Sequence, residues 1–212
     1  MKKGIIFDLD GTLWDASGQV TRSWNMALAT LGEFQVRITR EDMMRFMGNL
    51  LLDIGRMMLP KNLSDARVQE IIDLCIEYEH AYLREHGAPL YENLVRTLTE
   101  LRKDYSLYIV SNCQAGYIEV FLDCTGLWAL FEDYECPGRT GLAKSENIKR
   151  ICERNHLDAA VYVGDTNGDY NATRKAGLPF IHAAYGYGKP QDATPAITHF
   201  GALPGLVKTI LE

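Results

Sequence analysis

The chain has 212 residues, a hydrophobic content of 47% and a formal net charge of −6, a composition typical of a globular protein with a sizeable core. The acidic balance and the lack of a long run of Lys or Arg argue against nucleic acid as a partner. Only three consecutive apolar residues precede the first aspartate, too few for a signal peptide or a membrane span, so we expect a cytoplasmic protein that binds no membrane.

The N-terminal part of the chain changes character after one short strand. Residues 3–8 are an apolar run that ends in aspartate, which predicts a parallel strand buried on both faces. Between 18 and 86 the apolar spacing is helical only, and Thr39 followed by Asp42 is typical of a capping box. This pattern predicts an inserted helical bundle with helices over 23–32, 39–48, 51–59 and 64–87.

After Pro89 strands and helices alternate. The apolar runs predict strands over 105–111, 131–136, 159–165 and 179–184. The segments between and before them predict helices over 91–104, 117–126, 144–155 and 171–177. Strands separated by single helices require a parallel sheet with right-handed crossovers. We therefore expect an α/β fold, a doubly wound parallel sheet interrupted after its first strand by the helical bundle.

Polar residues gather where the predicted strands end, and ligands of open parallel sheets bind beyond the carboxyl ends of strands. Asp8 and Asp10 are two residues apart, so both side chains reach the same ligand, and Gly11 allows a sharp turn that exposes backbone N–H groups. The other polar residues at these ends are Thr12, Ser111, Asn112, Lys144, Asp165 and Asp169.

Three of these residues indicate a bound cation. Clustered carboxylates repel one another, so Asp8, Asp165 and Asp169 imply a metal, and hard oxygen ligands favour Mg²⁺. Mg²⁺ is commonly held by a few carboxylates together with a substrate phosphate. Donors for phosphoryl oxygens come from the loop N–H groups and from Lys144, Ser111 and Asn112. The combination predicts phosphoryl transfer.

The four segments resemble, in order, the motifs of the haloacid dehalogenase-like hydrolase superfamily over nearly the whole chain: DLDGT at 8–12, SN at 111–112, Lys144, and GDTNGD at 164–169. The resemblance implies a Rossmann-like catalytic core with a helical cap inserted after the first motif. On this reading the core comprises 1–16 and 87–212, and the cap comprises 17–86.

The resemblance also implies residue roles. Asp8 is the expected nucleophile that forms an aspartyl-phosphate, and Asp10 the general acid that protonates the leaving alcohol and then activates water. Asp8, the backbone carbonyl of Asp10, and Asp165 are expected to hold Mg²⁺, with Asp169 supporting it directly or through water. Lys144 is expected to offset charge on Asp8 and the phosphoryl group. The expected phosphate-binding residues are Gly11, Thr12, Ser111, Asn112 and Lys144.

These roles predict a Mg²⁺-dependent phosphatase for a small phosphorylated metabolite, similar to the phosphoglycolate phosphatase group. Asp10 disfavours dehalogenation, because the dehalogenase branch lacks that acid. The alternatives are a phosphomutase similar to β-phosphoglucomutase and, less favoured, a non-catalytic binding protein on this fold. The junctions at 14–18 and 86–91 are expected to act as hinges for a cap that selects the substrate. The sequence leaves the oligomeric state open.

Two further features have competing interpretations. Trp14 and Trp24 either line the cleft between cap and core or pack in the interior. The segment AYGYGK at 184–189 contains a GxG pattern without the third glycine and the helix of a dinucleotide site, so we expect a loop near the cleft.

Overall fold

The computed structural model describes residues 1–32 and 36–212. One sheet runs through the larger part of the molecule, and its strands have the order β3-β2-β1-β4-β5-β6 with every neighbouring pair parallel. The strands are β1 Lys3–Phe7, β2 Ser106–Val110, β3 Asp133–Glu135, β4 Ala159–Gly164, β5 Phe180–Ala183 and β6 Ala196–Ile197. The chain leaves β1 toward β2 and β3, then crosses back to β4, so the order reverses between β1 and β4, where open α/β sheets bind ligands.

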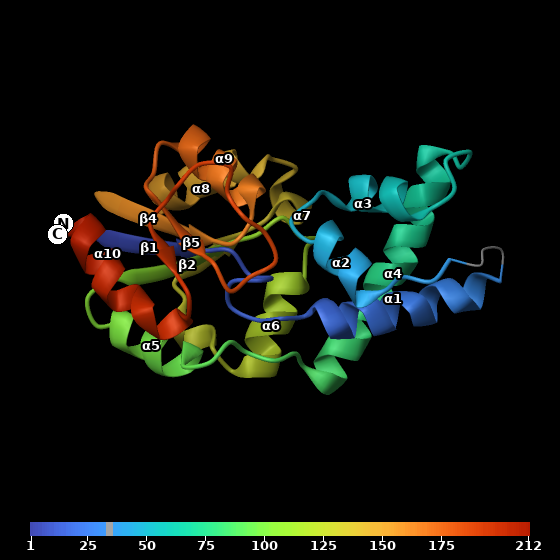
Figure 1. Cartoon of the computed structure of the whole chain (residues 1–212), viewed down its shortest axis with the longest axis horizontal. Helices are drawn as coiled ribbons and strands as arrows, with labels where there is room; N and C mark the ends of the chain where they lie inside the picture. The colour runs from blue at the N-terminus through green and yellow to red at the C-terminus, as the bar shows by residue number, and fades with distance from the viewer. Residues whose placement is uncertain (33–35) are drawn as a thin grey trace.

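Helices cover both faces of this sheet (Figure 1). Ile5 and Phe7 point to one face, and Ile6 points to the other because side chains alternate along a strand. The Ile5 face packs against α5 Leu94–Leu101, α6 Tyr117–Thr125 and α10 Leu203–Leu211. The Ile6 face packs against α8 Lys144–Arg154 and α9 Asn167–Ala176, and the short α7 Pro137–Thr140 precedes α8. A parallel sheet buried on both faces explains the unbroken apolar strands.

The remaining helices form a group beyond the carboxyl ends of the strands (Figure 1). They are α1 Ser17–Leu31, α2 Arg40–Phe46, α3 Leu51–Met58 and α4 Asp65–His86, and α1 packs along α4. The predicted capping box is present at the start of α2, where Thr39 and Asp42 bond each other's backbone N–H. We call residues 17–86 the helical unit; its role as a separate cap domain stays a prediction.

Two chain segments join the helical unit to the sheet, and they run side by side. Trp14 forms an isolated antiparallel bridge with Leu90, and the backbone N–H of Asp15 donates to the carbonyl of Pro89 at 2.8 Å. The junctions expected at 14–18 and 86–91 therefore lie against each other, and α4 packs against α6 as well.

The predicted fold class is confirmed, and the differences are local. The helix expected from 171 begins at Asn167, because Thr166 caps it with the side chain of Asp169. The expectations did not include β6, which has only two residues, or α10, whose Pro204 and Gly205 are poor helix formers in general. Proline is tolerated in the first helical turn, where its missing N–H has no intrahelical partner.

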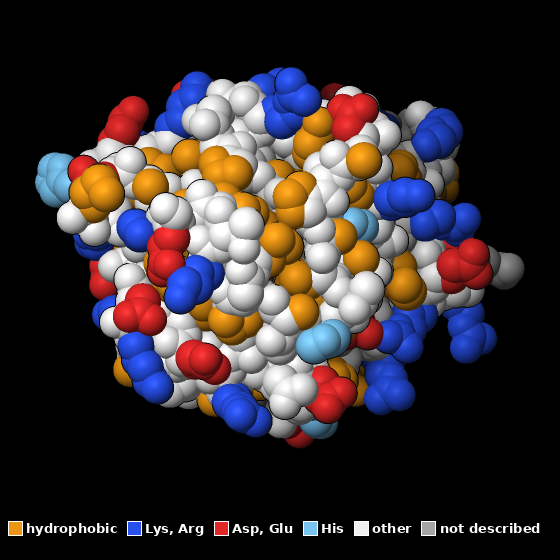
Figure 2. All heavy atoms as spheres, turned by 60° about the vertical axis from the view of Figure 1, so that its left-hand side comes forward, with side chains coloured by type: hydrophobic (Ala, Val, Ile, Leu, Met, Phe, Trp, Pro, Cys, Tyr) orange, Lys and Arg blue, Asp and Glu red, His pale blue; other side chains and the backbone are white. Residues whose placement is uncertain are grey.

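Charged side chains of both signs are interspersed over the face shown in Figure 2, between patches of apolar side chains. None of the described helices combines the length and apolar character that a membrane span requires.

Candidate active site

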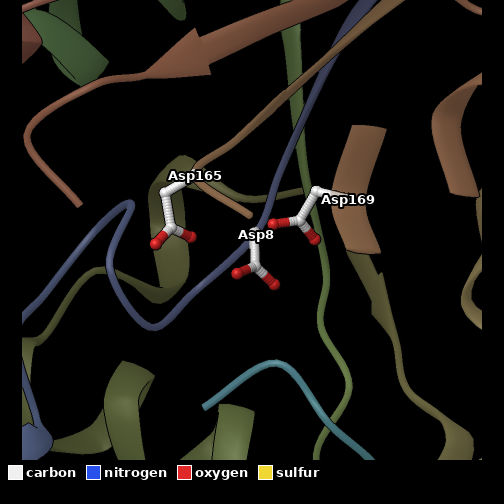
Figure 3. Close-up of side chains that lie close together, drawn as sticks. All are labelled: Asp8, Asp165 and Asp169. Atoms are coloured by element: carbon white, nitrogen blue, oxygen red, sulfur yellow. The ribbon is translucent and has the colours of Figure 1, made fainter. Parts of the chain in front are cut away.

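Three carboxylates meet at the carboxyl edge of the sheet (Figure 3). Asp8 follows β1, Asp165 follows β4, and Asp169 lies in the first turn of α9. Each offers an oxygen within 4.8 Å of the others, and all three residues are buried. The reversal of strand order beside β1 thus places side chains from distant parts of the chain at one point.

A buried lysine pairs with two of these carboxylates. Lys144 opens α8, and its Nζ donates to Oδ1 of Asp8 at 2.7 Å and to Oδ1 of Asp169 at 2.5 Å. Burial disfavours the ammonium, but the charges of Asp169 and Asp8 outweigh that cost and hold the pKa of Lys144 well above its ordinary value. The lysine therefore stays charged.

The carboxylate charges are only partly compensated. Three carboxylates face one lysine, so two negative charges remain when all are ionised. Burial and the charge of Asp169 raise the pKa of Asp8 to about 6, although Lys144 opposes the rise. Burial, Asp169 and Asp8 together raise the pKa of Asp165 well above its ordinary value. A divalent cation would relieve this repulsion.

Asp165 has the free oxygen that such a cation needs. Its Oδ2 accepts the backbone N–H of Tyr187 at 2.7 Å, while its Oδ1 is buried and has no hydrogen-bond partner among the described residues. An all-oxygen site of this kind suits Mg²⁺, which binds through a few carboxylates. The residues present therefore fit the predicted metal.

Asp169 is bonded through both oxygens. Its Oδ2 accepts from the backbone N–H of Thr166 at 2.9 Å and from that residue's hydroxyl at 2.7 Å, in a second capping box. Its Oδ1 accepts from Lys144. Asp169 is therefore held from two sides, by Thr166 and by Lys144, and its support of Mg²⁺, directly or through water, stays a prediction.

The side chain of Asp10 lies apart from the metal cluster. Its Oδ1 accepts from Nε1 of Trp14 and from the hydroxyl of Tyr117, both at 2.9 Å. Burial and the charge of Asp8 raise the pKa of Asp10 to about 8, so the carboxyl is largely protonated at neutral pH. Two donors fix the orientation of a group able to give and take a proton, as a general acid–base requires.

The predicted phosphate ligands surround the same point. Ser111 and Asn112 follow β2, and Thr12 follows the turn at Gly11. Oγ1 of Thr12 and Oδ1 of Asn112 are buried without a hydrogen-bond partner in the described structure. Gly11 has φ of +81°, and a Cβ there would lie 2.3 Å from Oδ2 of Asp165. Only glycine fits this turn, because it needs both the left-handed conformation and the space.

A cavity of about 40 Å³ lies between the carboxyl edge of the sheet and the helical unit. Asp8, Asp10 and Ser111 line it from the sheet side, and Trp24 and Glu79 line it from the helices. A larger cavity of about 1050 Å³ lies against α1 and contains none of the candidate residues. The small cavity is therefore the candidate site.

Two residues at the site, Tyr117 and Glu79, had no prediction attached. Tyr117 opens α6 and Glu79 lies within α4, and neither belongs to a sequence motif. Trp14 and Trp24, for which two interpretations were open, both pack in the interior and bond carboxylates near the site; of the two, Trp24 also lines the candidate cavity. The loop expected near the cleft does lie there, because its Tyr187 bonds Asp165.

The comparisons with known proteins agree with this geometry. Residues 5–183 match the haloacid dehalogenase-like hydrolase family, so the chain belongs to it. A phosphoglycolate phosphatase of Rhodobacter capsulatus is 29% identical, with 98% of each chain covered. A pyrophosphatase PpaX of Listeria welshimeri is 29% identical over 81% of this chain and 78% of that protein.

Solved structures share the fold. A predicted phosphoglycolate phosphatase from Haemophilus somnus superposes with a TM-score of 0.82 at 21% identity, covering 97% of this chain and 98% of the other. The predicted family, fold and hydrolase class are confirmed. The predicted site residues are brought together by the fold, and their individual roles stay predictions.

Proposed function

We propose that the protein is a Mg²⁺-dependent phosphatase that hydrolyses a small phosphorylated metabolite by way of a phosphoryl group carried on Asp8. The observation that carries the proposal is the different surroundings of two neighbouring aspartates. Asp8 is ion-paired with Lys144, whereas Asp10 accepts from Trp14 and Tyr117, and burial raises its pKa to about 8. One suits a nucleophile and the other an acid, and such division of a carboxylate pair is a mark of acid–base assignment.

In the first half-reaction a carboxylate oxygen of Asp8 attacks phosphorus, and the bond from phosphorus to the alcohol oxygen breaks. Asp10 gives its proton to the departing oxygen. Ser111, Asn112 and the unpartnered hydroxyl of Thr12 donate to the phosphoryl oxygens, and Lys144 offsets their charge.

In the second half-reaction Asp10, now ionised, takes a proton from water, and that water attacks the phosphorus bound to Asp8. The acyl-phosphate bond breaks, which releases phosphate and restores both aspartates. Asp8, Asp165 and the backbone carbonyl of Asp10 would hold Mg²⁺, which when bound supplies positive charge to the phosphoryl oxygens.

We also propose that 17–86 is a cap that moves against the core of 1–16 and 87–212. The cavity of about 40 Å³ is little larger than one water, so substrate entry requires opening. Two polar contacts across the cavity join the helical unit to the loop after β2: Nδ2 of Asn112 donates to the carbonyl of Gly48 at 3.0 Å, and Nε2 of Gln114 donates to Glu79 at 2.6 Å. Arg40 also pairs with Asp15, and the thiol of Cys124 donates to the carbonyl of Leu83. The paired junction at Trp14 and Leu90 fits a hinge.

The names of the relatives, phosphoglycolate phosphatase and pyrophosphatase, support hydrolysis of a phosphorylated small molecule. We still predict that the protein is cytoplasmic and that it binds neither nucleic acid nor membranes.

The test is phosphate release from a panel of phosphorylated metabolites with Mg²⁺ or with EDTA. We expect metal-dependent release that Asp8→Asn abolishes and that Asp53→Asn, an exposed change in α3, leaves intact. Release that is indifferent to EDTA or to Asp8→Asn would contradict the proposal. Activity that needs a sugar bisphosphate and yields an isomer would favour the mutase instead.

A further inference from the structure

An acidic residue of the helical unit faces the proposed reaction centre. Glu79 lies in the middle of α4, is 3% exposed and lines the same cavity as Asp8 and Asp10. The surrounding stripe of α4 is otherwise apolar, with buried residues Val68, Ile71, Ile72, Cys75 and Leu83. A carboxylate in that stripe is costly to bury, so its presence calls for a specific explanation.

The bonds to Glu79 favour its charged form. Its Oε2 accepts from Nε1 of Trp24 at 2.5 Å, and its Oε1 accepts from Nε2 of Gln114 at 2.6 Å. Both partners are N–H donors, which stabilise a carboxylate. Burial raises the pKa of Glu79 to about 7 against these bonds. The charge of Glu79 also helps to raise the pKa of Asp10, so the two groups sense each other across the cavity.

The cavity offers no positive charge to balance Glu79. Among the described residues that line it there is no Lys, Arg or His. Lys144 does not line the cavity and is already paired with Asp8 and Asp169. Arg45 and Lys189 line a separate opening, on the far side of the segment 47–49. On the side of the helical unit, away from the proposed Mg²⁺ position, Glu79 is therefore the charged group among the described residues that a leaving group meets.

We propose that the site takes phosphate monoesters whose leaving alcohol is neutral or bears an amine, and that Glu79 rejects alcohols bearing a carboxylate. A hydroxyl or ammonium group can donate to Glu79, whereas a carboxylate would lie unpaired beside it. The inference rests on the proposed phosphatase function and sets this protein apart from relatives named for phosphoglycolate.

The test compares three two-carbon esters that differ only at the far end: phosphoglycolate, hydroxyethyl phosphate and phosphoethanolamine. Assays at about pH 8 keep Glu79 ionised, since its pKa is about 7. We expect kcat/KM for the hydroxyl and amine esters to exceed that for phosphoglycolate by about tenfold or more, the effect of one charged hydrogen bond made or lost. Calorimetric binding of the same esters to Asp8→Asn gives the order without turnover.

Glu79→Gln removes the charge at nearly constant shape. We expect it to raise kcat/KM for phosphoglycolate and to lower kcat/KM for phosphoethanolamine. The preference for phosphoethanolamine over phosphoglycolate, measured as the ratio of the two kcat/KM values, should therefore fall by about tenfold. Glu77→Gln is the matched control, because Glu77 lies on the exposed side of the same helix and lines no part of this cavity.

Preference for phosphoglycolate, equal treatment of the three esters, or a ratio unchanged by Glu79→Gln would overturn the inference while leaving the phosphatase in place. p-Nitrophenyl phosphate distinguishes failure of the proposed role of Glu79 from failure of the proposed phosphatase function, since it reports turnover of an ester that bears neither a carboxylate nor an amine. No release from it or from any ester would overturn the proposed function, and the inference would fall with it.

Discussion

Replacing Lys144 by Met removes the only lysine that is bonded to the described carboxylate cluster. Its Nζ lies 2.7 Å from Asp8 and 2.5 Å from Asp169, and the residue is 5% exposed, so water cannot take over its role. One such pair is worth about 6 kcal/mol at an effective dielectric constant of about 20. Burying methionine does not carry the desolvation cost of burying a lysine, which offsets part of the lost attraction. We therefore expect the free energy of unfolding to fall by about 3–5 kcal/mol, as when one partner of a buried pair is removed.

The measurement is urea unfolding in EDTA near neutral pH. Lys149→Met is the matched control, because Lys149 is on the same helix but pairs with Glu146 at the surface, with its side chain 41% exposed. We expect the control to change the free energy of unfolding by about 0.5 kcal/mol or less. Added Mg²⁺ should recover part of the loss in Lys144→Met, because it returns positive charge to the carboxylates.

The pH dependence gives a second check on the same variant. Without Lys144 the pKa of Asp8 rises further above its unfolded value, so the folded state favours the protonated form. Stability is then retained at low pH and lost as the pH rises, and the gap to wild type should close in acid. Lys144→Met as stable as Lys149→Met in EDTA at neutral pH would refute the reasoning.

Three other outcomes are expected. Asp10→Asn should lower phosphate release by about 10²–10⁴-fold while Mg²⁺ still raises the melting temperature; loss of that rise would contradict a purely acid–base role. In EDTA the folded-state pKa values of Asp8 and Asp10 are raised to about 6 and about 8, so both groups stabilise the fold below about pH 4, and this stabilisation is lost as the pH rises to about 8. Thermal melts across this range should show a smaller fall of the melting temperature with pH in Asp10→Asn than in the wild type. Equal falls in the two proteins would refute this expectation. Gly11→Ala should lower the free energy of unfolding by at least about 1–2 kcal/mol and weaken Mg²⁺ binding, because φ at Gly11 is +81° and the added Cβ would lie 2.3 Å from Asp165. Gly18→Ala is the control and should change neither quantity, because the space around Gly18 is open.

The sequence predicted that the residues of the candidate site would lie together, because they follow the ends of predicted strands. Asp8 and Asp165 follow apolar runs, and parallel strands bring their carboxyl ends to one edge. This inference did not require knowing which strands are neighbours in the sheet. The ion pair between Lys144 and Asp169 could not be predicted in the same way, because it depends on how α8 and α9 pack over the sheet.

Glu79 was missed although a signal was present. It falls four residues after Cys75 and four before Leu83, on the apolar stripe of its own helix. A charged residue at a stripe position marks either a paired group or a ligand-facing one, but the sequence does not say which partner it meets. The donors are Trp24 and Gln114, which lie 55 and 35 residues away along the chain, so only the fold identifies them.

The positions of these charges suggest how one fold serves different substrates. The charges around Asp8 are set by the sheet edge and α8, and they suit any phosphate ester. The charge at Glu79 comes from α4, which enters the cavity from the opposite side and touches the sheet part through Gln114. The proposed opening of the helical unit would break this contact, so on that proposal a leaving group that disturbs Glu79 would also weaken the closed arrangement. On the proposed mechanism, selection by Glu79 would then act on the closed arrangement, in which water would be excluded during phosphoryl transfer.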